Sequence, residues 1–206
     1  PTTSVIDMGA DIIKTKKTHS ALPESLANEK FILMVGTIEP RKNYQTILNN
    51  VNLLKELDLS VVIVGKRGWE SDSFFKRLEE EESLGSVFWL QNVDDQTLLS
   101  LYEKCFLYLT TSHYEGYGLP VIEALQHGCC VISSNGGALP EAGKGVSLVY
   151  KSENELRNLL TQCATDNDHY NNVISKSKNI NVTSWKKSAS QLNSIISEFF
   201  DQEEIK

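Results

Sequence analysis

The chain has 206 residues, of which 40% are hydrophobic and 23% charged, and its formal net charge is -7. This length allows one well-packed core with appended elements rather than two independent cores, and the composition is that of a globular protein. The acidic balance argues against a nucleic-acid-binding surface, and no stretch approaches the roughly 20 apolar residues needed to cross a bilayer.

The first 30 residues show little apolar periodicity. They contain several threonines, a lysine-rich stretch and Pro23, a composition that predicts an extended segment rather than a packed element. They also lack the basic start, apolar centre and small-residue cleavage site of a signal peptide. We therefore expect residues 1–30 to be an interdomain segment.

The predicted core begins with two continuous apolar runs, Phe31–Val35 and Val61–Val64, which end at Gly36 and Gly65. Such runs are typical of buried parallel strands. Between them, apolar side chains recur with the three- and four-residue spacing of an amphipathic helix at Tyr44, Ile47, Leu48, Val51, Leu54 and Leu57. The pattern predicts a strand-helix-strand unit.

The alternation continues to about residue 150. The expected elements are helix Ser71–Ser83, strand Val87–Leu90, helix Asp95–Lys104, strand Phe106–Leu109, a helix from Leu119, strand Cys130–Ser133 and an apolar run Val146–Val149. Helices then follow at Glu153–Cys163, about Asp168–Ser177 and Trp185–Phe200. This order predicts an α/β fold, a Rossmann-like parallel sheet with helices on both faces, with ligands bound beyond the carboxyl ends of the strands.

One loop, Thr110–Glu123, follows a predicted strand and leads into a helix. Gly116 and Gly118 would permit a tight turn and close approach, and Pro120 suits the first helical turn. The unpaired N–H groups at that helix start favour a phosphate or diphosphate. Two carboxylates frame the loop, since Glu115 precedes the glycines and Glu123 lies on the helix, where it could bind a ribose diol.

Glu115 and Glu123 stand in an E-x7-E arrangement, and the segment EGYGLPVIEALQHG resembles the signature of the retaining glycosyltransferase family 4. Three further segments are similar to that family: FILMVGTIEPRKNY (31–44), VIVGKRGW (62–69) and VISSNGGALPE (131–141). The resemblance implies the C-terminal, donor-binding domain, which is one half of a GT-B architecture. SVIDMGAD (4–11) resembles the strand that links the two domains, so the N-terminal Rossmann-like domain is expected as a missing partner.

The resemblance also implies a division of the chain and a role for the main site residues. Residues 31–166 would form the nucleotide-sugar-binding domain, and residues 167–206 would be helices that pack toward the missing domain. Arg41 and Lys42 would bind the donor diphosphate, and Glu115 would contact the donor sugar and stabilise positive charge at its anomeric carbon. These three residues are the expected catalytic groups. Glu123 would bind ribose.

Further donor-binding residues are expected by the same resemblance. Backbone N–H groups of Gly118 and Leu119 would meet the diphosphate, and Val93 belongs to a segment, NVDDQTL (92–98), similar to the loop that reads the base. The other expected lining residues are Gly36, Thr37, Gly65, Lys66, His113, Gly116 and Tyr117. Many family members have an arginine where this chain has Thr37, and whether Arg41 compensates is left open. Trp69 is interpreted as a loop anchor.

No metal or other cofactor is expected. We identify no Asp-x-Asp pair that would hold a metal ion at the expected site, and in a retaining transferase the leaving diphosphate can itself take the proton of the acceptor. The four cysteines have no zinc-type spacing and two are adjacent, which disfavours a disulfide framework and fits a reducing cytoplasm. Any contact with the cytoplasmic face of a membrane would come through the missing domain.

The leading hypothesis is therefore donor recognition in hexosyl transfer from a nucleotide diphosphate sugar to a saccharide or lipid-linked acceptor. The segment GTIEPRKN (36–43) resembles mannosyltransferases of surface-polysaccharide assembly and favours GDP-mannose over another GDP- or UDP-hexose. Two alternatives stay open: a nucleotide-binding module without catalysis, and another GT-B chemistry such as a sugar-nucleotide epimerase. Acceptor, linkage and oligomeric state are not predicted.

Overall fold

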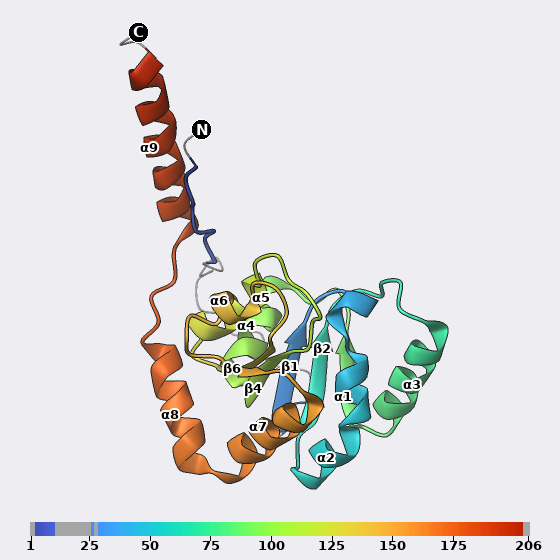
Figure 1. Cartoon of the computed structure of the whole chain (residues 1–206). Helices are drawn as coiled ribbons and strands as arrows, with labels where there is room; N and C mark the ends of the chain where they lie inside the picture. Colours follow the sequence, from blue (N-terminus) through green and yellow to red (C-terminus); the bar gives the residue numbers. More distant parts are fainter. Residues whose placement is uncertain (1–2, 11–25, 27–28, 204–206) are drawn as a thin grey trace. The chain divides into compact units, whose positions relative to one another are not determined.

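The computed structural model describes residues 3–10, 26 and 29–203 (Figure 1). Its strands are β1 (Phe31–Val35), β2 (Ser60–Val64), β3 (Val87–Leu90), β4 (Leu107–Thr110), β5 (Cys130–Ser134) and β6 (Leu148–Tyr150). Its helices are α1 (Gln45–Asn49), α2 (Val51–Glu56), α3 (Asp72–Ser83), α4 (Asp95–Lys104), α5 (Leu119–Gln126), α6 (Leu139–Ala142), α7 (Glu153–Thr165), α8 (Asn167–Lys178) and α9 (Trp185–Glu203), with a 3-10 turn η2 at Pro40–Lys42.

The strands form one parallel sheet in the order β3-β2-β1-β4-β5-β6. β1 pairs with β2 on one side, with Phe31 opposite Ser60, and with β4 on the other, with Ile32 opposite Leu107. The chain therefore winds outward in one direction from β1 and in the other direction from β4. Open α/β sheets bind ligands at the carboxyl ends of the two strands where this direction changes. The predicted fold class is confirmed, and it makes the loops after β1 and β4 neighbours.

Alternate residues of the central strands face opposite sides of the sheet. Ile32 and Met34 belong to a buried hydrophobic cluster that also takes side chains from α1, α2, α3 and α7. Leu33 and Tyr108 are equally buried but lie outside that cluster, as do the buried side chains of α4 and α5. Both faces are therefore covered by helices. Full burial of each large aliphatic side chain contributes about 1.5–3 kcal/mol to this packing.

The helix predicted from Tyr44 to Leu57 is interrupted at Asn50, which separates α1 from α2. Asn50 is fully buried. Its Nδ2 donates to the carbonyl oxygen of Thr46 at 2.8 Å and to Oε1 of Glu153 at 3.0 Å, and Arg157 donates to its Oδ1 at 2.8 Å. A side chain that bonds its own backbone competes with the helical pattern, and partners on α7 make the interruption stable.

The chain divides into two compact units, one of Thr15–Ile180 and one of Pro1–Lys14 with Asn181–Lys206. α8 packs on α7 and β5 in the larger unit. In the smaller unit, Ala10 N–H donates to the Thr183 carbonyl oxygen at 3.1 Å, and the Ser188 hydroxyl donates to the Asp7 carbonyl oxygen at 2.6 Å. A linking strand was expected at residues 4–11. That prediction is wrong for residues 4–10, the part that the structure describes, because these residues join no sheet. Most of the segment 1–30 lies outside the described residues.

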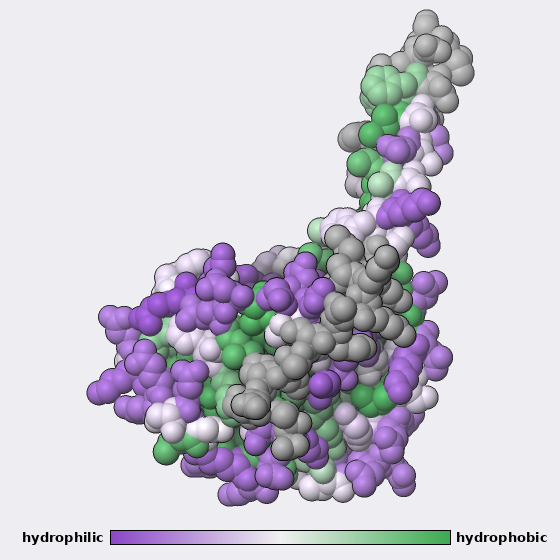
Figure 2. Space-filling model, turned by 180° about the vertical axis from the view of Figure 1, so that it is seen from behind, coloured by the Kyte–Doolittle hydropathy of each residue, from purple (hydrophilic) through white to green (hydrophobic). Residues whose placement is uncertain are grey.

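Helix α9 has an exposed apolar stripe. Its large side chains are between 44% and 60% exposed, and Figure 2 shows hydrophobic groups gathered along one side of the helix; they are Trp185, Leu192, Ile196, Phe199 and Phe200. Their spacing of three, four and seven residues puts them on one helical face. No helix in the described part of the chain is long and apolar enough to cross a membrane.

Candidate functional site

The loop after β1 begins with a glycine that makes room for a lysine. Gly36 has φ +147, and a Cβ atom there would lie 3.2 Å from Cε of Lys42. Such a φ is rarely adopted by residues with a side chain. The Tyr44 hydroxyl donates to the Gly36 carbonyl oxygen at 2.8 Å. Lys42, in the last turn of η2, can therefore extend back over the carboxyl end of β1.

Arg41 and Lys42 share the carboxylate of Glu115, which lies in the loop after β4. Nζ of Lys42 is 2.5 Å from Oε1, and Nη1 of Arg41 is 2.8 Å from Oε2. Nη2 of Arg41 also pairs with Glu39 at 2.7 Å, and the Ser112 hydroxyl donates to Glu115 at 2.8 Å. We call Arg41, Lys42 and Glu115 the cation–carboxylate cluster. The three residues expected to be catalytic are thus in direct contact.

Hydrogen bonds within the cluster stabilise the charged forms of Glu115 and Arg41. Burial would raise the pKa of Glu115, but hydrogen bonds from Lys42, Arg41 and Ser112 stabilise its charged form and lower the pKa overall. The hydrogen bond to Glu115 likewise raises the pKa of Arg41. With Glu39 included, two cations face two carboxylates. An anionic ligand would therefore have to exchange with a carboxylate for these cations.

Backbone contacts join the two loops that carry the cluster. The Thr111 hydroxyl donates to the Lys42 carbonyl oxygen at 2.8 Å, and the His113 N–H donates to the Arg41 carbonyl oxygen at 2.8 Å. Arg41 also donates through Nη1 to the carbonyl oxygen of Tyr114 at 2.7 Å. The loops after β1 and β4 therefore hold one another in place.

Helix α5 begins beside this loop with no side-chain cap. Gly118 is its N-cap, in a left-handed conformation with φ 82, and Pro120 occupies the first turn. A Cβ atom at Gly118 would lie 3.0 Å from Cβ of Ala142. Both conformation and space therefore require glycine at this position. Without a cap, the first N–H groups of the helix are available to an anion.

The structure corrects the prediction that position 116 requires glycine. We expected glycine there for a tight turn and close approach, as at Gly118. A Cβ atom at Gly116 would meet no atom within 4 Å, and its φ lies outside the positive range. Neither packing nor backbone conformation in this structure therefore requires glycine at position 116.

The second signature carboxylate, Glu123, lies one turn into α5. The Tyr102 hydroxyl donates to its Oε2 at 3.0 Å. Burial raises the pKa of Glu123, and the bond from Tyr102 opposes that rise only in part. The Tyr102 ring stacks on His127 with centroids 5.6 Å apart. Among the described contacts, no cation pairs with Glu123, in contrast to Glu115.

The remaining expected residues differ in how they relate to the cluster. Gly65 lies against Gly36, because a Cβ atom at position 65 would clash with the Gly36 carbonyl oxygen. The carbonyl oxygen of Lys66 accepts a hydrogen bond from the Ile38 N–H at 3.0 Å. No described contact joins Thr37 or Val93 to the cluster, and Tyr117 lies in the loop between Glu115 and α5.

The interpretation of Trp69 as a loop anchor is wrong, because its side chain is 72% exposed. An indole that held the loop in place would be covered by its neighbours. The loop after β2 is instead held by backbone pairing, since Ile38 and Arg67 form a parallel bridge.

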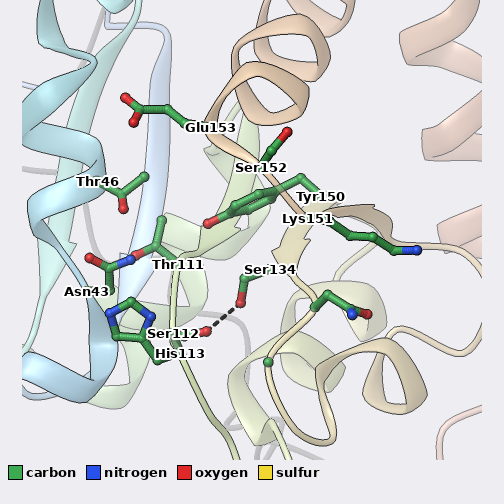
Figure 3. Close-up of a pocket in the computed structure, with 12 residues that line it drawn as sticks. Asn43, Thr46, Thr111, Ser112, His113, Ser134, Tyr150, Lys151, Ser152 and Glu153 are labelled. Carbon is green, nitrogen blue, oxygen red and sulfur yellow. Dashed lines mark hydrogen bonds between the residues drawn. The ribbon is translucent and has the colours of Figure 1, made fainter.

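A pocket of about 390 Å³ lies at the carboxyl ends of β4, β5 and β6 (Figure 3). Of the expected site residues, His113 alone lines it. The other lining residues, which the sequence did not single out, are Asn43, Thr46, Thr111, Ser112, Ser134, Asn135, Gly136, Tyr150, Lys151, Ser152 and Glu153. They come from four separate loops and share no local motif. The one sequence feature that they share is a position at or after the end of a predicted strand. Many other polar residues have the same feature, so it could not single them out.

No group of three or more His, Cys, Asp or Glu residues that could hold a metal ion occurs within the described residues. The four cysteines are free thiols, with the Sγ atoms of Cys105 and Cys129 3.7 Å apart and those of Cys130 and Cys163 3.9 Å apart.

The sequence model of a family described as "Glycosyl transferases group 1" matches residues 16–180. The serotype-specific mannosyltransferase WbdA of Escherichia coli is 34% identical over 197 residues, which cover 89% of this chain and 23% of that protein. The O-antigen chain mannosyltransferase B of Escherichia coli is 35% identical over 127 residues, or 60% of this chain and 33% of that protein. The chain thus spans about a third or less of these relatives.

Two solved structures share the fold. The C-terminal domain of a glycosyl transferase group 1 protein, LpcC, from Francisella tularensis superposes with a TM-score of 0.62 at 23% identity, covering 72% of this chain and 82% of that domain. The Anabaena protein HepE, solved with UDP-glucose, superposes with a TM-score of 0.71 at 19% identity, covering 84% of this chain and 50% of that protein. The predicted match to a C-terminal domain of the GT-B architecture is confirmed.

Proposed function

Since the chain belongs to the glycosyl transferase group 1 family, known as family 4, we propose that it is the donor-binding half of a retaining hexosyltransferase. Its substrate would be a nucleotide diphosphate sugar. The single observation that carries this proposal is the cation–carboxylate cluster, held at the switch between β1 and β4 and followed directly by the uncapped start of α5.

The chemistry of the transfer sets what the cluster must do. The bond between the anomeric carbon and the donor diphosphate breaks, and a bond to the acceptor oxygen forms on the same face. The acceptor proton passes to the leaving diphosphate. Negative charge grows on the diphosphate and positive charge grows on the sugar, so cations and a carboxylate beside the breaking bond lower the barrier.

Arg41 and Lys42 would bind the diphosphate, together with the N–H groups of Gly118 and Leu119. Because both cations are paired with carboxylates in this structure, binding would exchange part of those pairs for phosphate oxygens. Glu115 would then face the donor sugar. This exchange couples donor binding to the release of the carboxylate that stabilises the positive sugar.

Glu123 would accept hydrogen bonds from the ribose hydroxyls, a role supported by its half-buried carboxylate without a cationic partner. Gly36, Gly65 and Lys66 would line the cleft, and the loop at Val93 would read the base. Arg41 would also take over from the arginine that Thr37 replaces.

We propose mannose as the transferred sugar and GDP-mannose as the donor, because both relatives described above are named as mannosyltransferases. The acceptor would be a saccharide or a lipid-linked saccharide. The relatives are several times longer than the aligned segment, which supports a second Rossmann-like domain in the parent enzyme, and the apolar stripe of α9 would pack on it. Four free thiols fit a cytoplasmic enzyme.

Calorimetric titration of the 206-residue chain with GDP, UDP and ADP tests the proposal. We expect GDP to bind most tightly, and Lys42→Ala to weaken binding by roughly 10-fold to 100-fold through loss of a charged hydrogen bond. Lys104→Ala removes an exposed lysine from the end of α4 and serves as the matched control. The proposal fails if none of the three nucleotides binds, or if both variants weaken binding equally.

We propose that the reaction needs no metal ion. In the full-length enzyme, transfer from GDP-mannose should proceed at an unchanged rate in the presence of a chelator. Loss of activity with a chelator and its recovery with magnesium would contradict this proposal.

A further inference from the structure

Of the residues expected to bind the donor, only His113 lines the pocket in Figure 3. None of Arg41, Lys42, Glu115 and Glu123 lines it. Ser112, which lines the pocket, connects it to the carboxylate of the cation–carboxylate cluster by donating to Glu115 at 2.8 Å. Its volume of about 390 Å³ falls in the range of small-molecule sites, roughly 300–1,000 Å³.

Tyr150 presents an unused hydroxyl to this pocket. Its side chain is only 7% exposed, and in Figure 3 its hydroxyl points across the pocket toward the start of α1. No hydrogen bond to it occurs among the described residues. Burial raises its pKa, so the group stays a neutral donor and acceptor. Because the hydroxyl opens onto the pocket, its hydrogen-bond partner would be a ligand or water.

Two more neutral side chains face the same space from the β1–α1 segment. Asn43 is held in the left-handed conformation, with φ 51, and Thr46 lies in the first turn of α1. Neither side chain makes a hydrogen bond within the described part of the chain, whereas Thr111 and Ser134 already donate to the carbonyl oxygens of Lys42 and Ser112. An amide and two hydroxyls are therefore free to bind a ligand.

The charges around the pocket disfavour an anion. The Glu153 carboxylate lines it and is held there by Asn50 at 3.0 Å. Lys151 also lines it, but its side chain extends away from the pocket centre in Figure 3. A phosphate would meet a carboxylate without a facing cation. A neutral sugar, whose hydroxyls both donate and accept, matches the amide, hydroxyls and carboxylate.

We propose that this pocket binds a neutral saccharide unit on the acceptor side of the transfer reaction, through Tyr150, Asn43 and Thr46. The acceptor role rests on the proposed function, because hexosyl transfer needs a second sugar beside the donor. Ser112 would connect the two sites, since the pocket and Glu115 share it. A bound acceptor would thereby lie next to the carboxylate expected at the anomeric carbon.

Nuclear magnetic resonance of the isotope-labelled 206-residue chain tests the pocket directly. The probes are methyl α-D-mannopyranoside, an α-linked mannobiose, inorganic phosphate and GDP. We expect both saccharides to shift the Asn43 side-chain amide and the Thr46 and Tyr150 backbone signals in a saturable way. Tyr150→Phe and Thr46→Val should each weaken saccharide binding roughly 3-fold to 10-fold, the effect of one neutral hydrogen bond.

Thr161→Val on α7 is the matched control and should change saccharide binding less than 2-fold, because Thr161 does not line the pocket. The melting temperature separates binding from structure. Tyr150→Phe should leave it unchanged within a few degrees, because the hydroxyl has no protein partner to lose. A large drop with Tyr150→Phe would contradict a free hydroxyl and overturn the proposal.

The outcomes distinguish this proposal from the proposed function. GDP binding without any saccharide shift overturns the pocket and leaves the donor site intact. Saccharide shifts at Arg41 and Glu115 instead of Asn43 and Tyr150 also overturn it, as do pocket shifts caused by phosphate. Saccharide binding in the pocket without nucleotide binding supports the site but removes its acceptor role.

Discussion

Glu115 and Glu123 belong to one short motif, yet their surroundings are opposite. Glu115 contacts Arg41 and Lys42 at 2.8 and 2.5 Å, and those contacts lower its pKa. Glu123 lies on α5, where the Tyr102 hydroxyl donates to it at 3.0 Å, and burial raises its pKa. Divergent environments give similar carboxylates different roles. Under the proposed function, Glu115 would act among charges that change during the reaction, and Glu123 would bind neutral hydroxyls.

The largest expected effect concerns transfer in the full-length enzyme. Glu115→Gln should lower kcat by roughly 100-fold to 1,000-fold, the cost of losing one group that stabilises transition-state charge. The change keeps the shape of the side chain, so nucleotide affinity should stay within about 3-fold. Steady-state kinetics with GDP-mannose measure both. Glu141→Gln on α6, an exposed glutamate, is the control, and equal losses in both variants would contradict the assignment.

The second effect concerns nucleotide binding rather than turnover. Glu123→Gln should weaken GDP binding to the 206-residue chain roughly 10-fold, because hydrogen bonds to a charged acceptor contribute about 1.5–3 kcal/mol. Glu115→Gln should therefore have the larger effect on kcat, whereas Glu123→Gln should have the larger effect on GDP affinity measured by calorimetry. A Glu123→Gln variant that binds GDP as tightly as the wild type would remove the ribose role.

The two substitutions should also have different effects on the free energy of unfolding. Glu115→Gln leaves Arg41 and Lys42 without their shared carboxylate and should lower the free energy of unfolding by about 1–3 kcal/mol. Glu123→Gln removes a charge that the fold desolvates and should leave stability equal or higher. Urea unfolding at pH 7 measures both. Equal destabilisation by the two substitutions would show that the difference in surroundings has no energetic effect.

The smallest effect is the pH dependence of those stability differences. Because the folded pKa of Glu115 lies below its usual 4.5, its stabilising contribution is complete above 4.5 and is lost as pH falls through the lower folded value. For Glu123 the folded pKa lies above 4.5. The cost of its buried charge is present at neutral pH and disappears as pH falls toward 4.5. Unfolding of wild type and both Gln variants between pH 7 and pH 4 should show these opposite trends.

Local patterns were sufficient for the fold. Strand Phe31–Val35 and helix Asp95–Lys104 were predicted with the bounds that the structure gives, because burial and capping there depend on adjacent residues. The interruption at Asn50 was not predictable, since it depends on Glu153 and Arg157, more than 100 residues away in sequence. Contacts of that range leave no periodic signal.

For the candidate site, the sequence likewise predicted the residues of one local motif but not the contacts between distant segments. The glycine, proline and carboxylate spacing after β4 identified Glu115, Glu123 and the start of α5, which the structure places at the expected edge of the sheet. It did not reveal that Glu39 pairs with Arg41. Nor did it identify Tyr150, which is an ordinary strand-end tyrosine in sequence and becomes a pocket residue only once β6 lies beside β5.

The hydrogen bonds from Thr111 and His113 to the carbonyl oxygens of Lys42 and Arg41 have a consequence for engineering. Loops that support one another in this way contribute non-additively when changed. A chimera that imports the β1–α1 loop of another transferase to alter donor choice would pair a foreign backbone with the native β4–α5 loop. Exchanging both loops together preserves that fit, and the two should be treated as one cassette.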